Sequence, residues 1–135
     1  MTPVRPPRTA RRVAASIVVA LLVAAVAGAC SGDDRAEVQV VADPKASVDH
    51  DYVIPFGTNN RIVGGEDVTI VPQVLNVKVG DRIRIENQDD YGAQVGIFNV
   101  GAGETVTMEF TTPGRLEGAC DVHPSGTFTI NVRDA

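Results

Sequence analysis

Short runs of alternating apolar and polar residues most constrain the fold of this chain of 135 residues. Ile83 and Ile85 alternate with arginines and a glutamate, while Phe128, Ile130 and Val132 alternate with polar residues. A period of two gives each strand one dry face and one wet face. Turn residues, chiefly glycine and proline, separate these runs. We therefore predict an all-β fold, either an antiparallel β-sandwich or a small barrel.

The first 29 residues have the order of an export signal. Four arginines precede an apolar run from Val13 to Ala29, which ends in small residues directly before Cys30. Small residues before a cysteine resemble a bacterial lipoprotein signal, although Ala27 stands where such signals usually carry leucine. We expect 1–29 to be a signal peptide and Cys30 to be lipidated. The alternative is that the apolar run stays as a membrane anchor.

The remainder of the chain is strongly acidic. All 17 aspartates and glutamates lie after Cys30, together with only 8 of the 12 basic residues. Affinity for nucleic acid comes largely from Lys and Arg contacts with phosphates, so we exclude nucleic acid as a partner. Contact with the membrane is expected through the lipid at Cys30, on the extracytoplasmic face.

The domain boundaries follow from composition. Residues 30–51 are polar and acidic with no sustained period, and we predict that they form the lipidated cysteine and a flexible acidic tether. Residues 52–135 form the folded domain. Within it, Tyr52–Ile54 and Arg61–Val63 are weaker strand candidates, which would lie against a sheet edge.

The chain has two cysteines, Cys30 and Cys120. An exported protein could join them in a disulfide, but lipidation of Cys30 forbids this. Cys120 would then be a lone thiol, and a small buried apolar residue is the simplest explanation for it.

The stretch from Val68 to Val132 resembles the cupredoxins, the Greek-key β-sandwich family of blue copper proteins. The resemblance lies in the segments VLNVKVGDRIRIENQDD, VGIFNVGAGETVTMEFTTPG and GACDVHPSG. In that family a strand after Val-Gly-Asp leads to an asparagine, an acidic loop and the first copper histidine, and a Cys-x-x-His loop follows later. The resemblance implies a Greek-key antiparallel β-sandwich that binds copper and transfers electrons.

The copper ligands of the family are only partly present. Type 1 copper needs a thiolate, two imidazoles and usually a weak axial methionine. Cys120 and His123 match the Cys-x-x-His pattern, whereas Ala93 and Gly126 occupy the positions of the first histidine and the axial methionine. Gln94 should point to the other side of its strand. The resemblance therefore implies a degenerate copper site held by Cys120 and His123.

Other residues offer little to complete such a site. His50 has a carboxylate on each side, which favours its protonated form, and the alternative for it is an exposed tether residue. Met1 is lost with the signal, and Met108 belongs to an apolar strand face. Asp121, Glu117 or water could fill open positions, but hard oxygen donors suit Cu(I) poorly.

Cys120 and His123 also have a structural interpretation. Cys120 would be a small apolar plug, and His123 with Pro124 a hydrogen-bonded turn. Asn87 is expected to join two loops through hydrogen bonds to backbone, with or without metal. A structural zinc site needs four ligands, and Cys120 and His123 supply only two. A cysteine enzyme needs an orienting group and an oxyanion loop that the sequence does not show, so we do not expect an enzyme.

Three functions remain open. The first is an anchored copper-binding electron carrier, whose partners would be redox or copper-handling proteins of the cell envelope. The second is a metal-free module that binds a protein or small ligand at the loop end of the sandwich. The third is a copper chaperone that uses Cu(I) without electron transfer.

Overall fold

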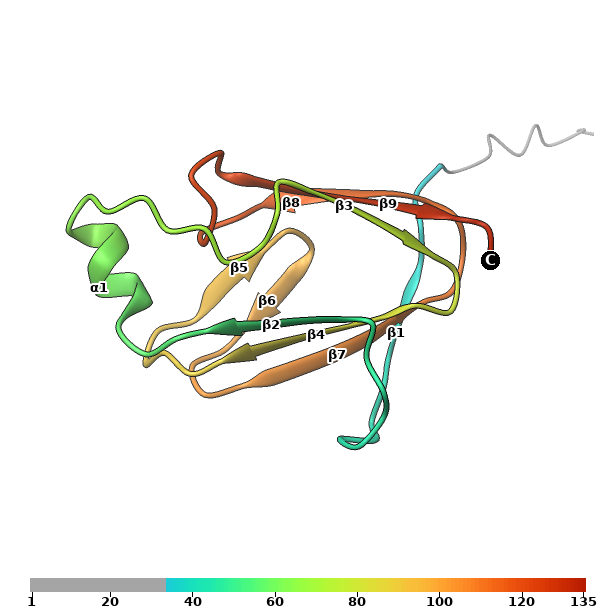
Figure 1. Cartoon of the computed structure of the whole chain (residues 1–135), viewed down its shortest axis with the longest axis horizontal. Helices are drawn as coiled ribbons and strands as arrows, with labels where there is room; N and C mark the ends of the chain where they lie inside the picture. The colour runs from blue at the N-terminus through green and yellow to red at the C-terminus, as the bar shows by residue number, and fades with distance from the viewer. Residues whose placement is uncertain (1–33) are drawn as a thin grey trace, which may run out of the picture. The chain divides into compact units, whose positions relative to one another are not determined.

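The computed structural model describes residues 34–135, which form a β-sandwich (Figure 1). The elements in chain order are β1 (Val38–Val40), β2 (His50–Ile54), α1 (Thr58–Val63), β3 (Val74–Lys78), β4 (Arg82–Asn87), β5 (Ala93–Val95), β6 (Phe98–Val100), β7 (Thr105–Phe110), β8 (Gly114–Ala119) and β9 (Thr127–Arg133). The predicted all-β class is confirmed. The predicted signal peptide and Cys30 lie outside the described residues.

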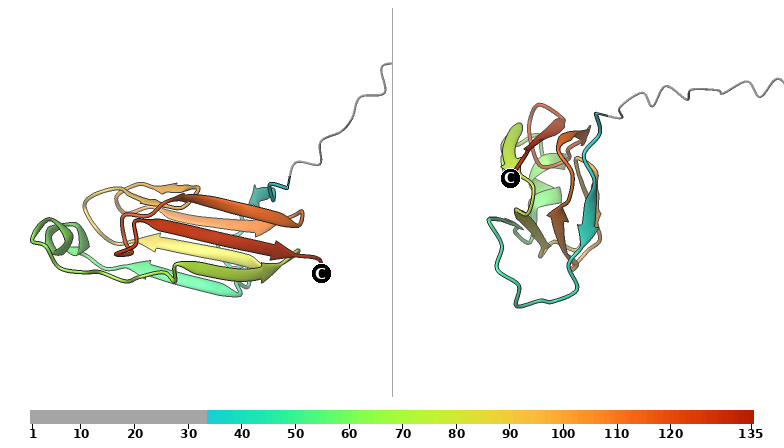
Figure 2. Two further views of the ribbon diagram at one scale, coloured as in Figure 1. Left: turned by 90° about the horizontal axis from the view of Figure 1, so that it is seen from above. Right: turned by 90° about the vertical axis from the view of Figure 1, so that its right-hand side faces the viewer.

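Two sheets face each other, and a hairpin closes one end. One sheet has the order β1-β7-β4-β2, the other has the order β3-β9-β8, and β5 pairs with β6 (Figure 2). The β2–β4 and β3–β9 pairs are parallel, so the sandwich is mixed rather than wholly antiparallel. The chain crosses to the second sheet between β2 and β4, and such a crossover is what a parallel pair requires.

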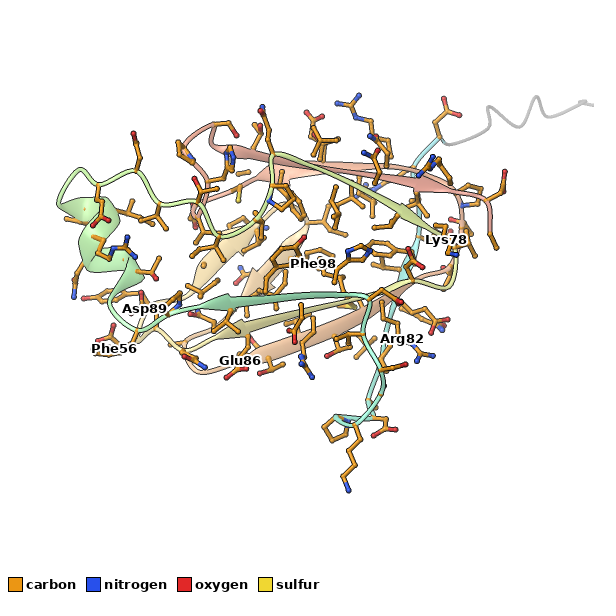
Figure 3. The ribbon with its side chains drawn as sticks, viewed as in Figure 1. Phe56, Lys78, Arg82, Glu86, Asp89 and Phe98 are labelled. Atoms are coloured by element: carbon orange, nitrogen blue, oxygen red, sulfur yellow. The ribbon has the colours of Figure 1, made fainter. Side chains whose placement is uncertain are left out.

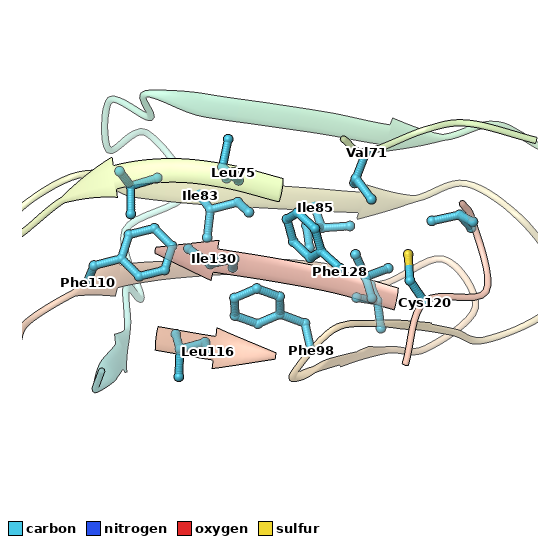
Figure 4. Packing of buried hydrophobic residues seen from close by; sticks show 14 of the residues in the cluster. Val71, Leu75, Ile83, Ile85, Phe98, Phe110, Leu116, Cys120, Phe128 and Ile130 are labelled. Atoms are coloured by element: carbon cyan, nitrogen blue, oxygen red, sulfur yellow. The ribbon is translucent and has the colours of Figure 1, made fainter. Parts of the chain in front are cut away.

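Inward-facing side chains of both sheets build the core (Figure 4). Ile83 and Ile85 of β4 are each 1% exposed, and Arg84 between them is half-buried. Phe128 and Ile130 of β9 are buried from the opposite sheet. Each such side chain contributes about 1.5–3 kcal/mol through removal from water. The alternation predicted from the sequence is therefore confirmed where the sheets pack.

The predicted tether is wrong over part of its length. Val38–Val40 forms β1, which pairs antiparallel with β7, and Ala36 is buried in the core. His50 and Asp51 belong to β2 rather than to a linker. β1 (Val-Gln-Val) covers the otherwise free edge of β7.

The strand expected at Arg61–Val63 is also wrong, because these residues form the second half of α1. Its six residues are too few to show a helical period in the sequence. By contrast, the weak candidate at Tyr52–Ile54 lies in β2, at a sheet edge as expected. Within residues 34–135, no helix has the length and apolar character needed to span a bilayer.

Candidate functional site

Cys120 and His123 lie in the loop between β8 and β9. The amide of Cys120 donates a hydrogen bond to the carbonyl oxygen of Gly126 (3.0 Å), and Gly126 donates to the carbonyl oxygen of His123 (2.9 Å). Cys120 also forms an isolated antiparallel bridge with Val95 of β5. This loop is therefore a compact turn fixed to the β5–β6 hairpin.

The thiol of Cys120 is part of the hydrophobic core. The residue is 4% exposed and belongs to the same cluster as Val71 and Phe128 (Figure 4). Burial raises the pKa of the Cys120 thiol, and the carboxylate of Asp121 raises it further. Backbone amides of Val122 and Gly96 partly oppose this rise in pKa. The thiol is thus held in its protonated form at neutral pH.

The imidazole of His123 is held by the turn itself. The backbone N–H of Ser125 donates to Nδ1 of His123 at 3.0 Å, and the Ser125 hydroxyl lies 2.7 Å from the same nitrogen. The Ser125 hydroxyl in turn donates to the carbonyl oxygen of Thr127. The lone pair of Nδ1 is therefore already used inside the protein, and a metal at this atom would have to displace these contacts.

Two positions at which the cupredoxins have copper ligands carry Ala93 and Gly126 in this chain. Ala93 is the first residue of β5 and is 8% exposed. Gln94 points to the other side of the strand, as expected, and its side chain donates to the carbonyl oxygen of Gly96. Gly126 has a φ of +69° and open space where a Cβ would stand. The side chains of Ala93 and Gly126 offer no ligand atom.

His50 does not lie beside these residues. It begins β2, whereas Ile54 at the other end of that strand lies near Ala93 and the loop end. Nε2 of His50 is buried without a hydrogen-bond partner, 3.6 Å from a carboxylate oxygen of Asp81 in the β3–β4 turn. His50 is therefore neither a copper ligand at the loop end nor an exposed tether residue.

The oxygen donors considered from the sequence are engaged elsewhere. Glu117 on β8 pairs with Arg115 and accepts a hydrogen bond from Thr129. Asp121 accepts a hydrogen bond from the backbone N–H of Gln94 at 2.8 Å. Met108 lies half-buried in β7. Within residues 34–135 no group of three or more His, Cys, Asp or Glu side chains is arranged to hold a metal ion.

Asn87 joins the loop after β4 to the end of β6. Its side-chain amide donates to the carbonyl oxygens of Tyr91 (2.8 Å), Val100 (3.2 Å) and Gly101 (3.1 Å). Its carbonyl oxygen accepts a hydrogen bond from the backbone N–H of Asp89 (3.0 Å). The residue is 1% exposed, so these bonds satisfy a buried amide. A role beside a metal stays a prediction.

A pocket of about 320 Å³ opens beside Ala93, between α1 and the loop end. We call it the α1 pocket. Its apolar wall consists of Ile54, Ile62, Ala93 and Val122, and its polar wall includes Thr58, Asn59, Asp89, Tyr91 and Asp121.

The sequence offered no signal for the α1 pocket, because the residue that fixes α1 comes from a distant loop. The carboxylate of Asp89 accepts hydrogen bonds from the backbone N–H groups of Gly57 (3.1 Å) and Asn59 (2.7 Å) at the start of the helix. Figure 3 shows Asp89 beside the start of α1. A capping motif within the local sequence would have predicted the helix, but this cap lies 30 residues away.

No protein-family model matches the chain, and no curated protein matches it. Among solved structures, the chain is similar to a Cu(I) form of an amicyanin mutant at 15% identity, over 72% of this chain and 99% of that one, with a TM-score of 0.45. It is also similar to a purple cupredoxin from Nitrosopumilus maritimus at 21% identity, over 63% of this chain and all of that one, with a TM-score of 0.42. Both similarities concern the fold alone.

Proposed function

We propose that residues 34–135 form a metal-free binding module of the cell envelope, with its binding site at the loop end of the sandwich. The observation that carries this proposal is the environment of Ala93. Where a copper site of the family's kind would need an imidazole, this chain has a methyl group that lines the α1 pocket. Loops on a rigid β-framework are common places for binding residues.

The donor set does not fit type 1 copper. Of the four ligands that this centre uses, the chain retains a thiol and an imidazole. The thiol of Cys120 is buried in the core, and Nδ1 of His123 is already hydrogen-bonded to Ser125. The side chains of Ala93 and Gly126 add no donor atom. Blue-copper electron transfer therefore has no basis in these residues.

A two-ligand Cu(I) site is the second candidate function, because Cys120 and His123 share one compact loop. Such a site would require the His123 ring to leave Ser125 and the Cys120 thiol to lose its proton. Both changes reduce the affinity for metal relative to a preformed site. We therefore place the metal-free module first.

The same residues argue for a binding protein rather than an enzyme. A cysteine nucleophile must be accessible and readily ionised, whereas Cys120 is 4% exposed and burial raises the pKa of its thiol. A histidine base must have a free ring nitrogen facing the nucleophile, and Nδ1 of His123 faces Ser125 instead.

Location in the envelope rests on the sequence. The basic, apolar and small residues before Cys30 support export and lipid attachment. Membrane fractionation of cells that express the full chain, compared with a Cys30→Ser variant, tests this part. We expect the full chain in the membrane fraction and the variant released from it. Equal membrane retention of both would instead support an uncleaved apolar anchor.

Copper titration tests the metal-free proposal. The full chain in the Cys30→Ser background, so that Cys120 is its only thiol, is titrated with Cu(II) and then with Cu(I) under a reductant. We expect no intense visible band from a copper–thiolate bond, and a Cu(I) affinity that Cys120→Ala leaves unchanged. An intense visible band would overturn the metal-free proposal and support a copper-binding electron carrier. A tight, colourless Cu(I) complex that Cys120→Ala abolishes would establish the two-ligand site.

A further inference from the structure

The α1 pocket contains a buried negative charge without a cationic partner. Asp89 is 4% exposed, yet none of the ion pairs within residues 34–135 includes it. Within the described part of the chain, the hydrogen bonds to its carboxylate come from the backbone N–H groups of Gly57, Asn59 and Asp90. Backbone amides stabilise a carboxylate but leave its net charge in place.

A second carboxylate increases this negative charge. Asp121 lines the same pocket and uses one oxygen to accept the N–H of Gln94. Among residues 34–135, no lysine or arginine lines the pocket. The cation on the helix, Arg61, forms an ion pair with Glu66. The pocket therefore holds two carboxylates with no compensating positive charge from its own walls.

The rest of the pocket is apolar or aromatic. Ile54, Ile62, Ala93 and Val122 provide a hydrophobic wall. Tyr91 also lines the pocket and is 52% exposed, so its ring is available to an incoming group. A flexible aliphatic stem with a cationic head uses both kinds of surface, because the stem packs on apolar side chains while the head reaches carboxylates or an aromatic ring.

Building on the proposed function, we propose that the α1 pocket binds an organic cation, namely an alkylammonium or alkylguanidinium group of about the size of a lysine or arginine side chain. The volume of about 320 Å³ is at the lower end of the range for small-ligand pockets, which suits such a group. The group can belong to a free small molecule or to a side chain of a partner protein.

Exposed apolar residues surround this end of the molecule. Phe56, in the loop before α1 (Figure 3), is 72% exposed. Val63 at the end of α1 is 79% exposed. These residues could contact the remainder of a larger ligand outside the pocket. A partner segment that carries the cation would then bind more tightly than the isolated side chain.

The test uses the full chain in the Cys30→Ser background and blocked amino acids as probes. N-acetyl-arginine methylamide is compared with N-acetyl-citrulline methylamide, its uncharged isostere, by NMR titration of backbone amides around Asp89, Ala93 and Asp121. We expect the arginine probe to bind about tenfold more tightly than the citrulline probe, because a hydrogen bond to a charged group is stronger than a neutral one. Equal affinities for the two probes would overturn the proposal.

Matched variants locate the site. Asp121→Asn keeps an oxygen for the N–H of Gln94 but removes the charge, and it should weaken arginine binding about two- to fivefold. Asp67→Asn makes the same charge change at an exposed residue that does not line the pocket, and it should leave binding unchanged. Equal effects of both variants would show a nonspecific attraction and overturn the proposal.

A pocket-filling variant gives a second readout. Ala93→Leu should abolish the amide shifts, provided that its spectrum shows a folded protein; where it does not fold, the Asp121→Asn and Asp67→Asn pair decides. A short peptide with a central arginine separates the two sources of the cation. Tighter binding of the peptide than of the blocked amino acid indicates a partner segment, and equal binding indicates a free small cation.

Failure of the organic-cation proposal can be distinguished from failure of the proposed function. Copper binding that depends on Cys120 would overturn the metal-free module whether or not the arginine probe binds. Absence of arginine binding, together with absence of copper binding, would overturn only the organic-cation proposal. The module would then bind a ligand of another class.

Discussion

The backbone N–H of Ser125 donates a hydrogen bond to Nδ1 of His123 at 3.0 Å. An N–H group can donate only to an unprotonated ring nitrogen, so the neutral His123 ring must carry its proton on Nε2. We predict that ¹⁵N NMR will show the Nε2–H tautomer for neutral His123. The Ser125→Ala variant retains the backbone donor and should show the same tautomer. A predominant Nδ1–H tautomer would contradict the hydrogen bond and would free Nε2 as a ligand atom.

The thiol of Cys120 should react slowly with alkylating reagents in the folded protein. It is 4% exposed, and burial raises its pKa, so both access and the thiolate fraction are low. We expect modification by iodoacetamide in the Cys30→Ser background to be many times slower than in denaturant. Rapid modification under native conditions would show that the Cys120 thiol is accessible. It would then support a reactive or metal-binding role for this residue.

The sandwich itself could be predicted from the sequence because its strands carry a period-two pattern. Ile83 and Ile85 reach the core as the alternation requires, and Gln94 turns away from Ala93 as a β-strand dictates. The Cys-x-x-His spacing likewise placed Cys120 and His123 in one loop. The local sequence pattern was therefore enough to predict which side chains face the core, because strand geometry alone decides this.

Elements fixed by distant contacts could not be predicted. β1 is held by its pairing with β7, at Val38 opposite Phe110, and its three residues are too few to show a period in the sequence. The α1 helix depends on Asp89, a residue from the loop after β4. The α1 pocket could not be predicted for the same reason. The helix and the strand ends that line it meet only in the folded chain.

Asn87→Ala should destabilise the domain by about 2–4 kcal/mol. Removal of the buried amide leaves the carbonyl oxygens of Tyr91, Val100 and Gly101 and the N–H of Asp89 without their partner, and buried polar groups without hydrogen bonds are costly. Urea unfolding measures the loss.

The control for this change is Asn131→Ala. The side chain of Asn131 donates to Asn76 in an exposed setting, and its loss should cost less than about 0.5 kcal/mol. Similar losses for the two variants would mean that the network around Asn87 adds nothing beyond a surface hydrogen bond.

Gly118→Ala should be destabilising because β8 passes very close to β5 there. A Cβ on Gly118 would overlap the carbonyl group of Gly96 and lie 3.1 Å from its Cα, and backbone cannot move aside as a side chain can. The strands would have to separate, which disturbs the hydrogen bond from the N–H of Gly96 to the carbonyl oxygen of Ala119. We expect a loss of about 1–3 kcal/mol in the free energy of unfolding.

Gly92→Ala is the matched control for this prediction. A Cβ on Gly92 would lie 3.5 Å from the carbonyl oxygen of Val100, an ordinary contact, so this variant should change stability by less than about 0.5 kcal/mol. Thermal and urea unfolding of both variants provide the comparison. A Gly118→Ala protein as stable as the control would show that β5 and β8 are farther apart than the structure has them.

Asp89 should make the stability of the domain depend on acid. Hydrogen bonds from the backbone N–H groups of Asn59 and Gly57 hold the pKa of Asp89 below its ordinary value of 3.8 in the folded protein. Since the folded value is the lower one, the ionised form favours folding. Its contribution is fully present above pH 3.8 and is lost as the pH falls through the lower, folded value.

The Asp89→Asn variant isolates this contribution. It should be less stable than the original chain at pH 7, and the difference should shrink as the pH falls below about 3.8. Asp51, whose pKa is lowered by an exposed ion pair with Arg84, provides the comparison. Because solvent screens that pair, Asp51→Asn should show a smaller change with pH. Urea unfolding from pH 2.5 to pH 7 measures all three proteins, and parallel curves for the original chain and Asp89→Asn would refute the role of Asp89 in fixing α1.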